Sequence, residues 1–238
     1  MDTRTETITA TKGGAFNATL VLPPGGSGPG ILLLQEIFGV GDFLLAKARD
    51  LAELGYVVLC PDVFWRIEPG VALEHDEASL QTAFGLVGRY SEEVDDETKG
   101  RDLLDALAHL RSLDEVAGHK VAVMGYCLGG FLAFLVACQG DVDACVSYYG
   151  SGTAAALGMA GGLTAPAIFH YGGDDPFIPP ADVEAVRAAL GGRADVEIHE
   201  HAGAGHAFEN FLAEQFSNPD AAGRSWALTV TFLQRVLS

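Results

Sequence analysis

The sequence predicts an α/β fold in which a mostly parallel sheet carries helices on both faces. Short apolar runs of strand type alternate along the chain with longer segments that have the period of a helix. Such alternation is typical of parallel strands joined by crossover helices. The 238 residues are 49% hydrophobic and show no internal repeat, so we expect a single domain with one core over residues 1–238.

A β-hairpin is expected at the edge of the sheet, because residues 5–10 and 15–22 alternate polar and apolar side chains around Lys12-Gly13-Gly14. Continuous apolar runs predict buried strands, since a parallel sheet is covered on both faces. These strands are expected at residues 30–35, 56–60, 121–124, 142–149, 166–171 and 195–199. Helices are expected from their periodicity at residues 43–54, 76–90, 95–113, 128–139, 179–190 and 219–237.

Two connecting segments have unusual compositions. Residues 91–97 are strongly acidic, and we interpret them as a solvated connector between two helices. Residues 151–164 are rich in Gly and Ala, and we expect a loop there. The sequence does not decide whether this loop acts as a lid.

The charge balance excludes some classes of partner. Lys and Arg number 14 against 32 Asp and Glu, which gives a net charge of −18. Such a chain is unsuited to nucleic acid or to an anionic membrane surface, and an anionic substrate would need a local patch of positive charge. The N-terminus lacks an apolar signal core and no run reaches transmembrane length, so we expect a cytoplasmic protein.

The cysteines do not predict a metal or disulfide framework. The chain has four, and no two of them form a C-x-x-C pair. No pair of histidines has metal-ligand spacing with a third ligand, so we expect no metal and no cofactor. Three of the cysteines lie in or near apolar strand or helix patterns and are expected to be ordinary reduced core residues: Cys60, Cys138 and Cys145.

The fourth cysteine lies in the stretch around which the chain is organised. Val121–Met124 predicts a buried strand, Gly125-Tyr-Cys-Leu-Gly129 a tight turn, and the residues from Leu128 a buried helix. This is the strand–turn–helix context of a nucleophile elbow, with Cys127 in the place of serine. The helix N-terminus favours a thiolate or an oxyanion nearby. The alternative is a structural cysteine in a glycine-rich turn.

A thiol nucleophile needs a base, and the base needs an acceptor that fixes its tautomer. His206 lies in a loop after the last strand, and Asp175 follows the strand before that. The order nucleophile, acid, histidine is the order found in α/β-hydrolases. Asp174 and His201 are the competing candidates, and a turn-capping role is the alternative for Asp175. The other histidines are expected to be structural at positions 170 and 199 and on the surface at positions 75, 109 and 119.

Glu36 is the remaining candidate, because it directly follows a buried strand. A carboxylate there is costly unless it is paired. Its functional role would be direct contact with the thiol of Cys127, and its structural alternative is a salt bridge or a helix cap.

Together these residues resemble the dienelactone hydrolases (carboxymethylenebutenolidases), a family of the α/β-hydrolase superfamily. The resemblance covers nearly the whole chain. It rests on six runs: Gln35-Glu-Ile-Phe-Gly39, Pro61-Asp-Val-Phe64, Pro69-Gly70, Gly125-Tyr-Cys-Leu-Gly-Gly130, the Gly-Gly-Asp-Asp-Pro-Phe-Ile-Pro run that ends at Pro179, and Gly205-His-Ala-Phe208.

The resemblance implies the α/β-hydrolase fold and a Cys127–His206–Asp175 triad. It implies that Glu36 protects the resting thiol and then takes its proton, and that the backbone N–H groups of Ile37 and Leu128 form an oxyanion hole. The implied reaction is hydrolysis of a lactone or carboxylic ester through a thioester.

The sequence departs from the family at the substrate, because two arginines that hold a carboxylate in dienelactone-hydrolysing enzymes correspond here to Leu80 and Asn210. Either Arg66 and Arg89 replace them, or the substrate is a neutral ester or lactone. The candidate substrate pocket comprises Phe38, Trp65, Phe84, Tyr126, Phe208 and Asn210.

Two interpretations of another class stay open at this point. One is a small-molecule binding protein without turnover, and the other is a thiol redox sensor at Cys127. The expected partner is a small ester or lactone, and the expected assembly is a monomer or a small homo-oligomer.

Overall fold

The computed structural model describes residues 2–238. They divide into two compact units, one on each side of the bond between Val121 and Ala122. Each unit is built from strands with helices packed on them, and each is described in turn. Whether the chain forms a single domain, as the sequence predicts, stays a prediction.

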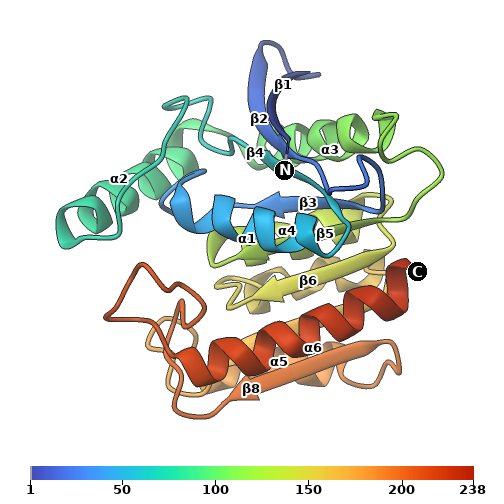
Figure 1. Ribbon diagram of the computed structural model, residues 1–238. Helices are drawn as coiled ribbons and strands as arrows, with labels where there is room; N and C mark the ends of the chain where they lie inside the picture. Colours follow the sequence, from blue (N-terminus) through green and yellow to red (C-terminus); the bar gives the residue numbers. More distant parts are fainter. Residues whose placement is uncertain (1) are drawn as a thin grey trace. The chain divides into compact units, whose positions relative to one another are not determined.

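The strands of the first unit lie in the order β1-β2-β4-β3 (Figure 1). The predicted hairpin is confirmed, since β1 and β2 pair antiparallel from the Thr3–Val21 pair to the Thr9–Ala15 pair. β2 also pairs antiparallel with β4, whereas β3 and β4 are parallel. The bounds are β1 Thr3–Thr9, β2 Ala15–Val21, β3 Gly30–Leu34 and β4 Val57–Pro61.

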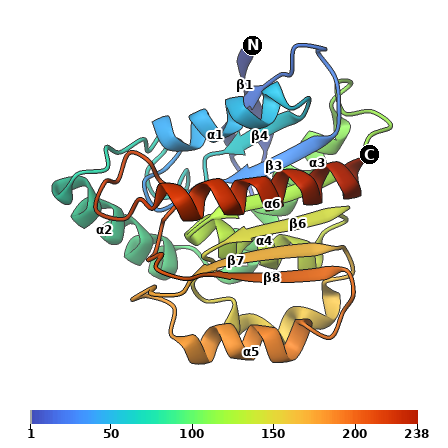
Figure 2. The same cartoon turned by 60° about the horizontal axis from the view of Figure 1, so that its bottom comes forward.

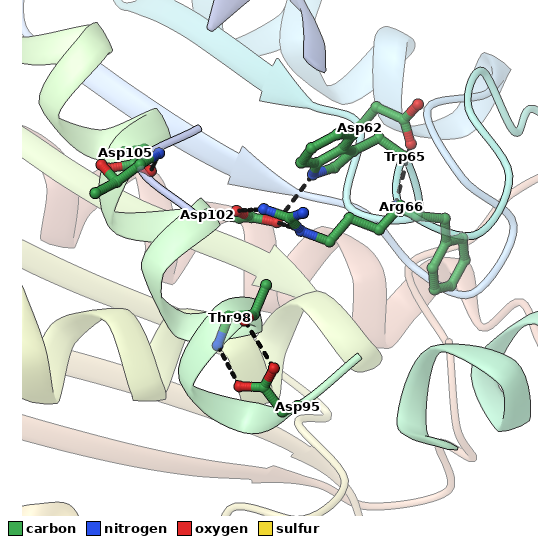
Figure 3. A network of polar contacts seen from close by, with 9 residues as sticks. Asp62, Trp65, Arg66, Asp95, Thr98, Asp102 and Asp105 are labelled. Carbon is green, nitrogen blue, oxygen red and sulfur yellow. Dashed lines mark hydrogen bonds and ion pairs between the residues drawn. The ribbon is translucent and has the colours of Figure 1, made fainter. Parts of the chain in front are cut away.

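Three helices belong to this unit: α1 Asp42–Glu53, α2 Glu77–Glu93 and α3 Asp96–Ser112. α1 packs on β4, and α3 packs on β3. The predicted acidic connector over residues 91–97 is wrong in extent, because α2 continues to Glu93 and α3 begins at Asp96. The reason is capping: Asp95 accepts hydrogen bonds from the backbone N–H and hydroxyl of Thr98 and so starts α3 directly (Figure 3).

The second unit has four parallel strands in the order β5-β6-β7-β8. Their bounds are β5 Val121–Tyr126, β6 Ala144–Tyr148, β7 Ala167–Gly172 and β8 Val196–His201. Every residue of β5, β6 and β7 is buried, which explains their unbroken apolar runs. β8 runs two residues further than the sequence predicts, because Glu200 and His201 still pair with Tyr171 and Gly172.

The helices of the second unit are α4 Leu128–Gln139, α5 Pro180–Leu190 and α6 Pro219–Leu237. α4 packs on β6, and α6 runs along β6, β7 and β8, on the opposite side from α5 (Figure 2). The expected loop at residues 151–164 instead contains a 3₁₀ helix, η1, from Ala154 to Gly162. η1 packs against α4 and α5, and its small residues allow that close approach.

We predict opposite effects for two glycine-to-alanine changes in this unit. A Cβ atom at Gly125 would lie 2.1 Å from the carbonyl oxygen of Gly129, so Gly125→Ala should lower the free energy of unfolding by about 3 kcal/mol. Gly223 lies on α6 with nothing within 4 Å of the added atom, so Gly223→Ala should raise the free energy of unfolding by about 0.5–1 kcal/mol. Urea unfolding followed by circular dichroism measures both, and equal effects would contradict this account of the turn.

Candidate active site

The turn after β5 holds Cys127 in a strained backbone conformation. Its φ is 54° and its ψ is −116°, a region that residues with a side chain rarely occupy. The backbone is held there from both sides, since the Cys127 N–H donates to the carbonyl of Tyr148 and its own carbonyl accepts from the N–H of Phe131. Gly130 lets α4 approach β6, because a Cβ there would lie 2.4 Å from the Tyr148 carbonyl oxygen. The result is the expected elbow, with Cys127 at the N-cap of α4.

Within the described residues, three non-glycine residues have a positive φ, and all three lie in the second unit. They are Cys127, Tyr149 at 37° and Ala207 at 54°. Tyr149 follows β6, and its ring lies 5.1 Å from the ring of His206. Ala207 directly follows His206. Backbone strain of this kind persists only where the surrounding structure enforces it, and it concentrates at functional sites.

The structure brings Cys127, His206 and Asp175 into one chain of contacts. The Nε2 atom of His206 lies 3.1 Å from the Sγ atom of Cys127, and its Nδ1 atom lies 2.7 Å from an Oδ atom of Asp175. Cys127 is partly exposed as a residue, whereas Asp175 and His206 are buried. This is the arrangement of a nucleophile, its base and the group that orients the base.

Asp175 has both of the roles that the sequence left as alternatives. Its Oδ1 atom accepts hydrogen bonds from the backbone N–H groups of Phe177, at 2.8 Å, and Ile178, at 3.2 Å. Its Oδ2 atom contacts His206. The turn therefore fixes the carboxylate in place, with one oxygen aimed at the imidazole. Asp174, the competing candidate, is held by its backbone N–H on the Ala204 carbonyl.

The environment of His206 favours its protonated form. Burial alone lowers the pKa of His206, but the charges of Cys127 and Asp175 and the hydrogen bonds to both outweigh burial and raise the pKa to about 10. The rings of Tyr149 and Phe177 flank the imidazole at 5.1 and 5.2 Å. An imidazolium beside a cysteine sulfur is the arrangement in which cysteine acts as a thiolate nucleophile.

The other three cysteines lie in different surroundings. Burial raises the pKa of Cys60 to about 12 and that of Cys138 to about 11, and it raises the pKa of Cys145 as well. Their thiols are therefore inert at neutral pH.

His201, the competing base, belongs to a buried hydrogen-bond network between β8, β7 and α6. Its Nε2 atom lies 3.1 Å from Nδ1 of His170, and Nε2 of His170 lies 3.0 Å from the hydroxyl of Thr229. That hydroxyl also bonds the phenol of Tyr148 at 2.7 Å. His199 stacks on His170 at 5.6 Å. His201, His170 and Thr229 therefore link β8, β7 and α6 as buried polar groups that satisfy one another. His199 is partly exposed and contacts Glu197 instead.

Glu36 lies in the first unit, directly after β3, and is buried as the sequence predicts. One of its carboxylate oxygens lies 3.9 Å from Nε2 of His75. The expectation that His75 is a surface residue is wrong, because its side chain is only 5% exposed. Its ring is packed against Phe38 at 4.3 Å and Phe43 at 6.4 Å, in the segment just before α2.

The two residues expected to supply oxyanion donors lie at suitable positions in their own units. Leu128 is the first residue of α4, where backbone N–H groups have no partner within the helix. Ile37 directly follows Glu36, in a turn that the N–H of Gly39 closes on the Glu36 carbonyl.

The residues of the candidate substrate pocket differ in their burial and in their contacts. Tyr126 and Phe208 are fully buried and belong to an aromatic cluster with Tyr148 and Tyr149. Asn210 is fully buried too, and its Oδ1 atom accepts from the backbone N–H groups of Leu212 and Ala213. Phe38 lies against His75, whereas Phe84 on α2 is 50% exposed.

Trp65 and Arg66 are held by a buried acid on α3. Asp102 accepts from the indole of Trp65 at 3.0 Å and from the guanidinium of Arg66 at 2.6 and 2.8 Å (Figure 3). The guanidinium also lies 4.2 Å above the Trp65 ring, and Phe16 stacks on that ring. Arg66 is thus committed to this network rather than to an anionic ligand.

Arg89 is similarly engaged with groups of the first unit. It contacts Glu93 and Glu68 and donates to the carbonyl of Ile67. Leu80, one of the two positions where the family resemblance would place an arginine, is a half-buried residue of α2.

Sequence reasoning does not find two residues that flank the ring of His206, Tyr149 and Phe177, because it assigns Tyr149 only to a strand and Phe177 only to a motif. In the first unit it does not find the burial of His75 beside Glu36. The one available signal was the position of Phe177 two residues after Asp175, because the contacts of Tyr149 and His75 depend on long-range packing.

Within residues 2–238, no group of three or more His, Cys, Asp and Glu side chains is arranged to hold a metal ion. In the same part of the chain, no helix combines the length and the apolar character that crossing a membrane requires.

Comparison with known proteins gives the family. The model of the dienelactone hydrolase family matches residues 16–237. The chain belongs to the dienelactone hydrolase family. A carboxymethylenebutenolidase of Pseudomonas sp. strain P51 is 36% identical over 236 residues, which cover 96% of this chain and 94% of that protein.

Solved structures support the same assignment and the fold. A dienelactone hydrolase-like promiscuous phosphotriesterase from metagenomic libraries has a TM-score of 0.81 at 25% identity, with all of both chains covered. An α/β hydrolase of Penicillium sp. sh18 has a TM-score of 0.73 at 14% identity, over 100% of this chain and 99% of that one. The predicted α/β-hydrolase fold is therefore confirmed for this dienelactone hydrolase family member.

The buried histidines predict how stability depends on pH. Burial, together with the neighbouring charged groups, lowers the pKa of His201 to about 4 and that of His170 well below its ordinary value of 6.5. Above about pH 6.5 both residues are neutral in the folded and unfolded chain; below it only the unfolded chain takes up the protons. The free energy of unfolding should therefore fall as the pH drops from about 6.5 towards about 4.

Urea unfolding at pH 7.5, 6 and 5 measures this decline. His201→Gln should flatten it, because the substituted side chain does not titrate. An unchanged slope in that variant would show that the histidine network does not cause the decline.

Proposed function

We propose that the chain is a cysteine-dependent hydrolase of a lactone or carboxylic ester that works through a thioester intermediate. The observation that carries the proposal is the unbroken contact from the Cys127 sulfur through His206 to Asp175. Membership in the dienelactone hydrolase family and the carboxymethylenebutenolidase relative support the same class of reaction.

The proposed chemistry begins with attack of the Cys127 thiolate on the substrate carbonyl carbon. A C–S bond forms, and the carbonyl π electrons move to the oxygen. The family resemblance implies that the backbone N–H groups of Leu128 and Ile37 stabilise this oxyanion. The intermediate collapses, the ester C–O bond breaks, and the His206 imidazolium protonates the departing alkoxide. In a lactone this alkoxide stays attached to the acyl chain. Water, deprotonated by His206, then cleaves the thioester and restores the thiolate.

Glu36 is proposed as the fourth member of the site. In the resting enzyme its carboxylate protects the Cys127 thiol. When substrate binds, the displaced carboxylate takes the thiol proton, so that an S–H bond breaks and an O–H bond forms. The family resemblance implies this step, and Glu36 lies buried directly after β3, where the resemblance places this carboxylate.

The substrate is proposed to be a neutral ester or lactone. The two positions that would bind a substrate carboxylate hold Leu80 and Asn210, neither of which carries a positive charge, and the side-chain oxygen of Asn210 is occupied in a turn. Arg66 is committed to Asp102, and Arg89 to its own acidic neighbours. In a chain of net charge −18, a free carboxylate on the substrate would be repelled rather than held. The cytoplasmic location and the oligomeric state stay predictions.

The triad is tested by two matched substitutions at neighbouring aspartates. Asp175→Asn should lower kcat/KM for an activated ester by roughly 10²–10⁴-fold, because His206 loses the acceptor that orients it. Asp174→Asn should stay within threefold of the parent, because its structural contact is made by the backbone. Cys127→Ala should abolish turnover while the circular dichroism spectrum is unchanged, and full activity in that variant would overturn the proposed function.

The substrate class is tested with a pair of aryl esters of equal acyl length. One has a neutral acyl group, and the other ends in a free carboxylate. We expect kcat/KM to be at least about tenfold higher for the neutral ester, which corresponds to about 1.4 kcal/mol of transition-state discrimination. Preference for the carboxylate, or rapid hydrolysis of dienelactone itself, would contradict the substrate proposal and leave the cysteine mechanism standing.

A further inference from the structure

The side chain of His75 is a buried imidazole that the proposed mechanism does not use. Its Nε2 atom is buried and has no hydrogen-bond partner within residues 2–238. A buried polar atom without a partner is costly, so its persistence calls for an explanation.

Among the described residues that line the small cavity beside this atom, Glu36 is the other one with a polar side chain. The small cavity around it is lined by apolar and glycine residues apart from Glu36, and it leaves no room for a water molecule. A carboxylate oxygen of Glu36 lies 3.9 Å from Nε2, which is about 1 Å longer than a hydrogen bond. The acidic residues on either side of His75 in the sequence, Glu74 and Asp76, are exposed, and so is Asp42 at the start of α1.

At 3.9 Å the two atoms make no hydrogen bond, and in the tautomer whose proton is on Nδ1 the Nε2 atom is an acceptor. A carboxylate oxygen and an unprotonated ring nitrogen are both acceptors, so neither can donate to the other. Once Glu36 has taken a proton it gains an O–H donor, and a small rotation of its side chain brings that donor to Nε2. The same pair of atoms then changes from two acceptors to a hydrogen bond.

We propose that His75 is a positioning residue that holds the protonated Glu36 carboxyl group after the thiol has given up its proton. The Glu36 O–H donates to Nε2 of His75, and no further bond is made or broken. Held there, the acid does not return its proton to the thiolate. This inference rests on the proposed role of Glu36 and assigns a function to a residue outside the triad.

The packing of His75 between two phenylalanines allows a sharp pair of variants. His75→Phe keeps an aromatic ring against Phe38 and Phe43 but removes the nitrogen. His75→Gln removes the ring but keeps a side chain with an acceptor oxygen. A merely structural histidine would tolerate Phe better than Gln, whereas the positioning role requires the opposite order.

The measurements are kcat/KM for the neutral ester and the rate of iodoacetamide reaction at Cys127, both as functions of pH from 5 to 9. We expect His75→Phe to lower kcat/KM about tenfold and to change the pH profile of alkylation, with His75→Gln within about threefold of the parent. In a Glu36→Gln background neither His75 substitution should have a further effect, because both act through the same carboxyl group.

Three results would overturn the inference. They are parent-like kinetics in His75→Phe, a greater loss in His75→Gln than in His75→Phe, or additive effects of His75 and Glu36 substitutions. Urea unfolding of each variant separates loss of fold from loss of positioning. Retained turnover in Cys127→Ala would instead overturn the proposed function, so the two failures are distinguishable.

Discussion

The strained backbone of Cys127 is the constraint on which the second unit depends. A residue with a side chain is held at a φ of 54°, so the unit must supply hydrogen bonds and close packing that compensate for the strain. Gly125 and Gly130 remove the Cβ atoms that would block the crossing of β5, α4 and β6. Because this crossing is rigid, the sulfur stands at a fixed point, and the imidazole can be set 3.1 Å from it.

The same constraint explains why the base is so heavily supported. Asp175 is locked by two backbone N–H groups, the imidazole is flanked by Tyr149 and Phe177, and Ala207 beside it is also strained. Charge rather than burial decides the pKa of His206, since burial alone would lower it. Cys127 on one side of the ring and Asp175 on the other therefore keep the buried histidine protonated and oriented.

Periodicity and turn residues predicted most of the fold and the three residues of the contact chain, because each follows from local chemistry. Cys127 directly follows β5, and Asp175 and His206 lie in the loops after β7 and β8, which is where a parallel sheet presents functional groups. Local pattern failed where distant packing or capping decides. The acidic connector is shorter than predicted because Asp95 caps α3. Residues 154–162 form η1 because their small side chains allow close packing against two helices. His75 is buried because Phe38 packs against its ring.

The central claim is that Cys127 carries the acyl group, and trapping that intermediate tests it most directly. The enzyme is mixed with a slowly hydrolysed neutral ester, quenched in acid and analysed by intact-mass and peptide mass spectrometry. The account predicts one acyl group per chain, located on the peptide that contains Cys127 and released by hydroxylamine as expected of a thioester. An acyl group on another residue, or steady turnover by a chain whose Cys127 is already alkylated, would contradict it.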